Sequence, residues 1–528
     1  MHVGVSSDLQ PVRRVSWWRA GSAAVAVSVV LTWFEIWTYS DCLGSFFHFD
    51  DFWVLAAAAH IPPHSLSQLW RVFEPIHGFL LYRPLSTVLY FFTLREAFGY
   101  DPVGYHAVQI AFQALNGLLV YAIADSILFS RPLAAAAALI YVTAPGHALA
   151  ACWVALFTMT GTTFLYFFAV WVWVRLDSRW RFPLTFLLFC LALLASEHAV
   201  SLPLTLTATS LLLTQRSGMG SQTTPAAGPG HRKEAARGGA ARRTWRELAA
   251  FYLVGGSYVV AKLYYMRYGL AGAFPDPAAR AYVEAGYHVS FEPVSILRHL
   301  GRYCTFTIDL LYDRAQSDTA ALFLGVCVVL VAAGATVAVA MDWRKARPLR
   351  VAAFGLDVFI IGLAPVLVLP EHFYSYYVGI AAMGMALAIV GVTAALPRVS
   401  RLAPWVAVAL IMAVHMGSTA MSVRASTEFR FLRSFSESAA RWLYTLRQHA
   451  DDAGVAEVVV PESGLTDLVF NTGKAHQLFL CADYQVVTAK DMRTVEPTKG
   501  RLILVQPDPL PSALKGSRPW LHPCPDPG

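Results

Sequence analysis

Residues 321–341 read ALFLGVCVVLVAAGATVAVAM, an uncharged run that is long enough to cross a bilayer as one helix. About 20 mostly apolar residues span the hydrocarbon core of a membrane. Ten similar runs recur along the chain, at 17–37, 104–128, 132–150, 153–174, 182–195, 199–213, 248–266, 351–369, 377–396 and 403–423. The runs at 182–195 and 199–213 are shorter than the others. The sequence therefore predicts an α-helical polytopic membrane protein with about eleven transmembrane helices.

The composition excludes a soluble globular domain. Of the 528 residues, 56% are hydrophobic and 14% are charged, whereas about a quarter of a typical soluble domain is charged. The net charge of +7 does not indicate nucleic-acid binding, because Lys and Arg gather in short clusters between the apolar runs. With about eleven spans every cluster lies on one face, which the positive-inside rule makes the cytoplasmic one. The first apolar run is interpreted as an anchor, not a cleaved signal peptide.

The opposite face receives two long loops. The first external loop, residues 38–103, contains apolar segments at 67–73 and 84–98 that we expect to lie as interfacial helices. In the second loop, residues 294–311 are either another interfacial helix or a twelfth span. We prefer the interfacial helix, because a twelfth span would move the later basic loops to the wrong face. A Gly-, Ser- and Arg-rich stretch at 215–246 is interpreted as a cytoplasmic linker.

Two domains are expected, a transmembrane domain over residues 1–425 and a small periplasmic α/β domain over 426–528. The second is predicted to contain a helix at 429–448 and strands at 456–460, 477–480, 485–488 and 501–505. Cys481 and Cys524 of this tail can pair only if it lies outside the cytoplasm. The seven cysteines show no CxxC spacing, so no zinc site is predicted.

The first candidate site is the pair Asp50 and Asp51, set among aromatic residues in the stretch FHFDDFW at 47–53. Beside a membrane surface, one of two adjacent carboxylates can have a raised pKa and accept a proton from a substrate. The alternative interpretation is an acidic loop, or Asp50 as a helix N-cap.

Two basic residues follow. Arg83, in the sequence YRPL, is placed to bind a lipid phosphate, or else it is an interfacial anchor whose side chain snorkels. His106 lies inside a predicted span, where a polar group is either functional or part of the contact between helices.

Two polar turns complete the candidates. Glu197 and His198 interrupt a hydrophobic hairpin, and they either face a cavity or form a short outer turn. Glu371 and His372 lie between two predicted spans on the same outer face, with Tyr376 close behind, and this too is consistent with an ordinary polar turn. Together these clusters, distant in sequence, are expected to meet at one membrane face.

Taken as a set, these motifs resemble a known family. Asp50-Asp51, Tyr82-Arg83-Pro84-Leu85 and Gly104-Tyr105-His106 with Asn116 resemble the motifs of polytopic glycosyltransferases of the C-type fold (GT-C). The pattern is most similar to transmembrane O-mannosyltransferases with tetratricopeptide repeats and their bacterial relatives. SEHAVSLP at 196–203 is similar to the Ser-Lys-Glu-x-x-x-x-Leu-Pro of that group, and EHFY at 371–374 resembles its Glu-Arg-Tyr-Leu turn.

The resemblance implies an inverting transfer of a sugar from a polyprenyl-phosphate-linked donor to a protein, lipid or glycan acceptor. The reaction would take place at the periplasmic face of a bacterial inner (plasma) membrane. Asp50 is implied as the base, and Asp51 would assist it. The residues implied near the donor or lining the site are Arg83, His106, Glu197, His198, Glu371, His372 and Tyr376. No metal-ligand set or cofactor is predicted, and a divalent metal is left open.

The sequence departs from the family pattern in three ways. The Lys of the Ser-Lys-Glu motif is absent, His372 stands where the turn has Arg, and no tetratricopeptide repeats follow the last span. Two other classes of protein therefore remain as alternatives. A transporter or flippase would carry charges at the bilayer midplane and show two related halves. A non-catalytic assembly factor of envelope glycan synthesis would tolerate loss of the Asp pair.

Overall fold

The computed structural model describes most of the chain. The described residues are 17–59, 61, 66–74, 82–213, 244–264, 288–307, 317–341, 347–395, 403–425, 427–450, 455–466, 469–470, 475–480, 484–497 and 501–509. The pairing expected between Cys481 and Cys524 lies outside these residues, as do positions 215–243 of the linker expected at 215–246. The last three positions of that linker, 244–246, are the first turn of a helix that continues to 264.

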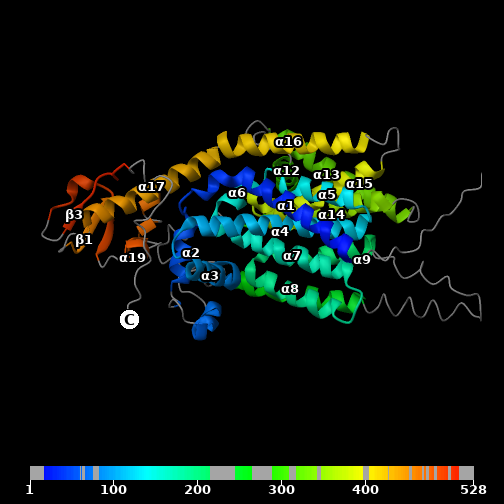
Figure 1. Ribbon diagram of the computed structural model, residues 1–528, viewed down its shortest axis with the longest axis horizontal. Helices are drawn as coiled ribbons and strands as arrows, with labels where there is room; N and C mark the ends of the chain where they lie inside the picture. Colours follow the sequence, from blue (N-terminus) through cyan, green and yellow to red (C-terminus); the bar gives the residue numbers. More distant parts are fainter. Residues whose placement is uncertain are drawn as a thin grey trace, which may run out of the picture.

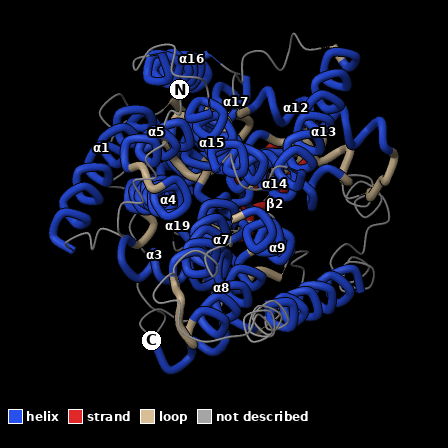
Figure 2. Tube along the Cα trace, turned by 90° about the vertical axis from the view of Figure 1, so that its right-hand side faces the viewer, coloured by secondary structure: helices blue, strands red, loops and turns tan. Residues whose placement is uncertain are grey.

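A bundle of apolar helices forms the body of the molecule (Figure 1). In Figure 2 the same helices are viewed nearly along their axes, with α4, α7, α14 and α15 near the centre. The members are α1 (Trp17–Leu43), α4 (Pro102–Leu128), α5 (Arg131–Val142), α6 (His147–Cys152), α7 (Phe157–Arg175), α8 (Arg181–Ala195), α9 (Leu202–Leu212), a helix at 244–264, α13 (Asp318–Met341), α14 (Arg347–Leu367), α15 (Gly379–Ala395) and α16 (Ala403–Ala425).

Within the described residues, five helices are long and apolar enough to cross a membrane. They are Pro102–Leu128, Val154–Arg175, Asp318–Val337, Pro348–Leu367 and Ser375–Ala395. Shorter apolar helices lie at Arg131–Val142, Arg181–Ala195 and Trp405–Met421. The membrane-spanning character of the chain is therefore supported, while the count of about eleven spans stays a prediction.

Small residues let the helices approach closely, as is usual when lipid supplies no hydrophobic drive for association. A Cβ on Gly355 of α14 would lie 2.4 Å from the backbone nitrogen of Ala388 in α15. A Cβ on Gly384 of α15 would lie 2.4 Å from the nitrogen of Phe359 in α14. Alanine at either glycine would therefore force these two helices apart.

One predicted span is not a single helix. The run 132–150 is divided into α5, which ends at Val142, and α6, which begins at His147. Pro145 and Gly146 lie in the break. Proline removes a backbone donor and clashes with the preceding turn, so hydropathy alone overestimated the length of this helix.

The predicted interfacial segments are helical. In the first loop, η1 (Leu66–Phe73), η2 (Pro84–Leu89) and α3 (Tyr90–Phe98) follow α2 (Asp50–Ala58). In the second loop, α12 (Pro293–Phe306) is short and packs against α13. The helices of the first loop lie at the end of the bundle that faces the sheet (Figure 1), which we call the sheet end.

The C-terminal segment forms a small α/β unit. Helix α17 (Thr427–Ala450) leads to a parallel sheet of order β2-β1-β3, made by β1 (Glu457–Pro461), β2 (Gln485–Ala489) and β3 (Arg501–Ile503). The strand predicted at 477–480 is wrong, because these residues belong to the helix α19 (Ala475–Leu480). A short apolar run cannot by itself distinguish a strand from a buried helical turn.

This unit is docked onto the first loop. The Ser436 hydroxyl of α17 accepts a hydrogen bond from the backbone nitrogen of Phe46 at 2.7 Å. Phe479 of α19 packs against Phe46, Phe47 and Phe52, with ring centroids 5.6 to 6.0 Å apart. The two segments therefore share one buried aromatic core at the sheet end.

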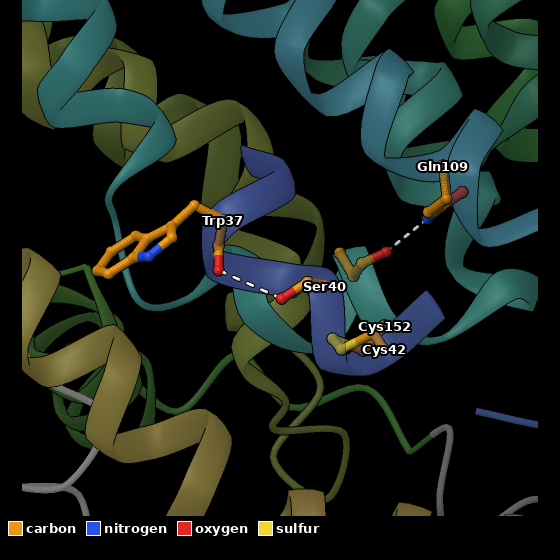
Figure 3. The surroundings of a disulfide bond; sticks show 6 residues. Trp37, Ser40, Cys42, Gln109 and Cys152 are labelled. Atoms are coloured by element: carbon orange, nitrogen blue, oxygen red, sulfur yellow. Dashed lines mark hydrogen bonds between the residues drawn. A yellow bond between two sulfur atoms is a disulfide. The ribbon is translucent and has the colours of Figure 1, made fainter. Parts of the chain in front are cut away.

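A disulfide, which the sequence did not predict, closes the same end of the bundle. Cys42 at the end of α1 bonds to Cys152 at the end of α6, with Cα atoms 5.2 Å apart (Figure 3). Disulfides persist in oxidising compartments. The bond therefore supports the expectation that the first loop faces away from the cytoplasm.

Replacing Cys42 with serine is expected to lower the stability of the folded bundle by about 2 kcal/mol. That figure is at the low end for a disulfide, because membrane-anchored helices already restrict the unfolded chain. Thermal unfolding in detergent, with thiol labelling of Cys152, measures the change. Protein from cells that lack an oxidising pathway for disulfides should match the variant, and equal stability of all three proteins would contradict the assignment.

Candidate active site

Asp50 begins α2, directly after a residue with unusual backbone geometry. Phe49 has φ 36°, a region that costs a non-glycine residue energy and is sustained only by surrounding contacts. Those contacts are the Phe435 ring, stacked at 4.0 Å, and the Trp153 ring at 5.6 Å. Phe49, not Asp50, is the N-cap, so the alternative interpretation of Asp50 as a cap is wrong.

Asp50 is an exposed residue, although protein closely surrounds its carboxyl group. This environment, with the neighbouring charge of Asp51, raises the pKa of Asp50 to about 6, while Arg83 opposes the shift. A carboxylate with a pKa near neutrality is suited to accept a proton and release it again. Asp50 is thus accessible, titratable and near a cation.

Asp51 differs from Asp50 in both position and contacts. It is fully buried. Oδ1 accepts a hydrogen bond from the backbone nitrogen of Ala155 at 2.6 Å, and Oδ2 accepts one from the nitrogen of His48 at 2.8 Å. The role implied for Asp51, that of assisting the base, is therefore not supported, because both of its carboxylate oxygens bind backbone N–H groups. Asp51 fixes the start of α2 against the loop before α7, and Asp50 alone is exposed.

Replacing Asp51 with leucine is expected to destabilise the protein by about 2–4 kcal/mol. Two backbone N–H groups would lose their acceptor inside the protein, and each costs about 1–3 kcal/mol when left unsatisfied. Asp51→Asn keeps one acceptor oxygen and should lose less. Thermal unfolding of purified protein measures both, and a normal melting temperature for the leucine variant would refute this structural role.

A second charged group lies where η2, η4 (Glu197–Ser201) and the helix at 244–264 meet. The Arg83 guanidinium binds both carboxylate oxygens of Glu197, with Nε donating to Oε2 at 3.0 Å and Nη2 donating to Oε1. The Lys262 ammonium lies 3.8 Å from Glu197 Oε2. Two cations thus share one carboxylate, and this cluster, which we call the Arg83 cluster, carries a net positive charge.

Burial alone would raise the pKa of Glu197, but Arg83 and Lys262 more than offset it and hold the pKa well below its usual range. Burial lowers the pKa of His198 to about 4 despite the adjacent Glu197, while Arg83 and His372 lower it further. At neutral pH the Arg83 cluster therefore contains a carboxylate, and the imidazole of His198 beside it is neutral.

Of the other candidate residues, some lie by the site and some do not. Tyr376 interacts electrostatically with Asp50, and His372 with His198, so both lie by the site. His106 is fully buried and packs edge-on against His48, with ring centroids 6.3 Å apart. Glu371 is exposed and interacts with His299 of α12.

Sequence reasoning missed three residues that the structure brings to this region. Lys262 was hidden at the end of an apolar helix, although a lone lysine in a predicted span is itself a signal of function. Phe435 and Ser436 lie in a helix of the C-terminal segment that gave no sign of contact with residues 46–49. Among the described residues, no group of three or more His, Cys, Asp or Glu side chains is placed to hold a metal.

Comparison with known proteins does not assign the chain to a family. No protein-family model matches the sequence, and no curated protein matches it. A solved structure with some similarity is the cryo-electron-microscopy structure of the arabinofuranosyltransferase AftD from mycobacteria, with a TM-score of 0.40 and 14% identity over 84% of this chain. This chain spans 29% of the length of that one. Since the TM-score is too low to assign a shared fold, any function has to be inferred from the geometry of the site.

Proposed function

We propose that this protein is a membrane glycosyltransferase that uses a polyprenyl-phosphate-linked sugar at the extracytoplasmic face. The observation that carries the proposal is the position of Asp50, an accessible carboxylate with a raised pKa, beside the Arg83 cluster at the sheet end of a membrane bundle. A donor with a polar sugar and a lipid tail has to react at the membrane surface, and this is where an acid–base group and a cation are both available.

The Arg83 cluster fits the departing phosphate. Glu197 neutralises one of the two cations, so Arg83 and Lys262 retain one positive charge between them. The Lys262 ammonium has no hydrogen-bond acceptor within the described residues. Guanidinium and ammonium groups are the usual partners of phosphate oxygens. The resemblance leads us to expect a lysine next to Glu197 in the sequence, as in the Ser-Lys-Glu motif, and this lysine is absent. Lys262 supplies a cation beside Glu197 from another helix instead.

In this proposal Asp50 acts as the base. Its carboxylate takes the proton of an acceptor hydroxyl, the oxygen forms a bond to the anomeric carbon from the opposite side, and the bond from that carbon to the phosphate oxygen breaks. The polyprenyl phosphate leaves with the electron pair, next to Arg83 and Lys262. The anomeric configuration is inverted. Asp51 holds the start of α2, and Tyr376 and His372 lie around the reacting groups.

The rate of transfer is expected to depend on the ionisation of Asp50. A base works only when deprotonated, and the pKa of Asp50 is raised from 3.8 to about 6. We therefore expect kcat/KM to be level above about pH 7 and to fall about tenfold per pH unit below pH 6. The profile should be measured in proteoliposomes from pH 4.5 to 8.5. A level profile down to pH 5 would exclude Asp50 as the base.

The direct test uses purified protein in liposomes with synthetic polyprenyl-phosphate sugars. Candidate donors carry mannose, glucose or arabinofuranose, and the assay follows both the release of polyprenyl phosphate and the sugar that becomes attached to an acceptor. Release that depends on an acceptor supports the enzyme. Movement of the intact donor between leaflets without cleavage would support a flippase, and neither activity with any donor would support an assembly factor.

A cellular experiment narrows the donor. Deleting the gene should cause the lipid-linked form of the true sugar to accumulate, because its consumer is missing. A plasmid that carries the native gene should reverse the accumulation, and one that carries Asp50→Asn should not. Reversal by the Asn variant would assign the effect to assembly instead of catalysis.

A further inference from the structure

The backbone turn that leads into Asp50 has an aromatic residue where a glycine is usual. The Asp51 backbone nitrogen donates a hydrogen bond to the His48 carbonyl at 2.8 Å, which closes the turn. Phe49, its second residue, has φ 36° and ψ −113°. These values are close to those of the second residue of a type II′ turn, a position that glycine usually occupies. A side chain there costs energy, so the contacts of the Phe49 ring have to offset that cost.

Helix α17 contacts this turn through two adjacent residues. The Phe435 ring stacks on the Phe49 ring, with centroids 4.0 Å apart and planes 28° apart. Phe435 is 6% exposed, so the stack lies inside the protein. The Ser436 hydroxyl accepts a hydrogen bond from the backbone nitrogen of Phe46 at 2.7 Å. The C-terminal segment therefore holds the first loop at the residue directly before Asp50 and again three residues earlier.

A second ring contact to Phe49 comes from the segment before α7. The Trp153 ring lies 5.6 Å from the Phe49 ring. Trp153 directly follows Cys152, which the disulfide to Cys42 ties to the end of α1. Leu432 of α17 belongs to a buried cluster with residues on both sides of Trp153. Phe49 is thus packed against two segments that also pack against each other.

Docking of the C-terminal segment does not by itself require an aromatic residue at position 49. The aromatic core around Phe479 already joins the two segments, and a glycine would form the turn at less cost. A phenylalanine makes the turn depend on its ring contacts, because without them the residue favours negative φ. Since Phe49 directly precedes Asp50, a change in its φ turns the start of α2. The Asp50 carboxyl then moves relative to the Arg83 cluster.

We propose that Phe435 and Ser436 are positioning residues, through which the C-terminal domain sets the direction of the Asp50 carboxyl. When α17 is docked, the ring stack holds Phe49 at positive φ, and Asp50 lies near the Arg83 cluster. When the stack is lost, Phe49 relaxes and Asp50 moves away. This inference rests on the proposed function and gives the C-terminal domain a role in the same site. The domain acts through the backbone of the first loop, without contact to the substrate.

Hydrogen–deuterium exchange of the purified full-length chain in nanodiscs tests the contact without any need for activity. The probes are the backbone N–H groups of Asp51 and Phe52, which bond to the carbonyls of His48 and Phe49. Phe435→Leu keeps an apolar side chain and removes the flat ring. Exchange of both probes should become faster by about 2–10-fold, the loss expected for one aromatic pair.

The same substitution in a Phe49→Gly background separates positioning from docking. Glycine adopts positive φ without strain, so the turn no longer depends on the stack. Phe435→Leu should then change exchange at Asp51 by less than about twofold, the scatter of independent sites. Trp442→Leu is the matched control, because Trp442 is also 6% exposed and lies two turns further along α17. It should lower the melting temperature and leave exchange at Asp51 unchanged.

Kinetics of sugar transfer in proteoliposomes complete the test. Phe435→Leu should lower kcat by about tenfold or more with little change in KM for the donor, because a displacement of about 1 Å at a reacting group costs up to about 10²-fold. Adding Phe49→Gly should restore most of kcat. Unchanged exchange in Phe435→Leu, equally faster exchange in both backgrounds, or native kcat despite faster exchange would each overturn the proposal. The expected exchange pattern, with no transfer from any donor, would keep the control of this turn by α17 and reject the glycosyltransferase.

Discussion

Replacing Asp50 with asparagine is expected to reduce sugar transfer by roughly 10²–10⁴-fold, the usual contribution of a positioned general base. Asparagine is close to isosteric with aspartate and can still hydrogen-bond to an acceptor hydroxyl, but it cannot take the proton. The expected defect is therefore in kcat, with little change in KM for the donor. Steady-state kinetics in proteoliposomes, with the donor and the acceptor varied in turn, separate the two.

The same variant should fold normally. The raised pKa of Asp50 means that the folded protein disfavours the ionised form compared with the unfolded chain. Removing that charge should leave the melting temperature unchanged or slightly raised at pH 7. Asp50→Glu is the informative companion, because it keeps the base and displaces it, and it should retain part of the activity. Full activity of Asp50→Asn with normal folding would remove Asp50 from the mechanism.

The sequence was sufficient to select Asp50 as a candidate base, but it did not show that the adjacent Asp51 has a structural role. Adjacent acidic residues after a predicted span were enough to select the pair. They could not distinguish the two, because that distinction depends on Ala155, whose backbone nitrogen binds Asp51 from a distant segment. Helical periodicity carries no information on which carboxylate meets such a group. The pattern placed Asp51 in the site, and the contacts place it in the support of the site.

Hydropathy predicted most helices of the bundle because the period and length of an apolar helix are local properties. The division of the run 132–150 at Pro145 could have been predicted from the same residues, since proline ends helices. The disulfide between Cys42 and Cys152 could not, because pairing depends on how α1 and α6 approach. Lys262 likewise joins Glu197 only through the packing of the helix at 244–264.

Breaking the Arg83–Glu197 pair is expected to remove both activity and stability. Loss of one partner from a buried ion pair costs about 3–5 kcal/mol. Here we expect about 2–3 kcal/mol, because the side chains keep 13% and 27% of their surface exposed and water screens part of the charge. Arg83→Gln and Glu197→Gln should both lower the melting temperature. Arg83→Lys should lose most of the transfer activity, since a lysine cannot reproduce the two-point contact of guanidinium.

The double variant Arg83→Gln/Glu197→Gln separates the two effects. It leaves no unpaired member of the pair, so its stability should recover toward the native value, giving a coupling energy of about 1–3 kcal/mol in a double-mutant cycle. Its activity should not recover, because the phosphate has lost its guanidinium.

The matched control is the ion pair Arg181–Glu247, whose atoms are 2.7 Å apart and whose side chains are similarly buried. Arg181 is the first residue of α8, whereas Glu197 follows the last residue of that helix, so the control pair lies at the opposite end of α8. The same cycle there should change stability and leave transfer intact. If both double variants kept native activity, the Arg83 cluster would be a structural contact and the phosphate would have to bind elsewhere.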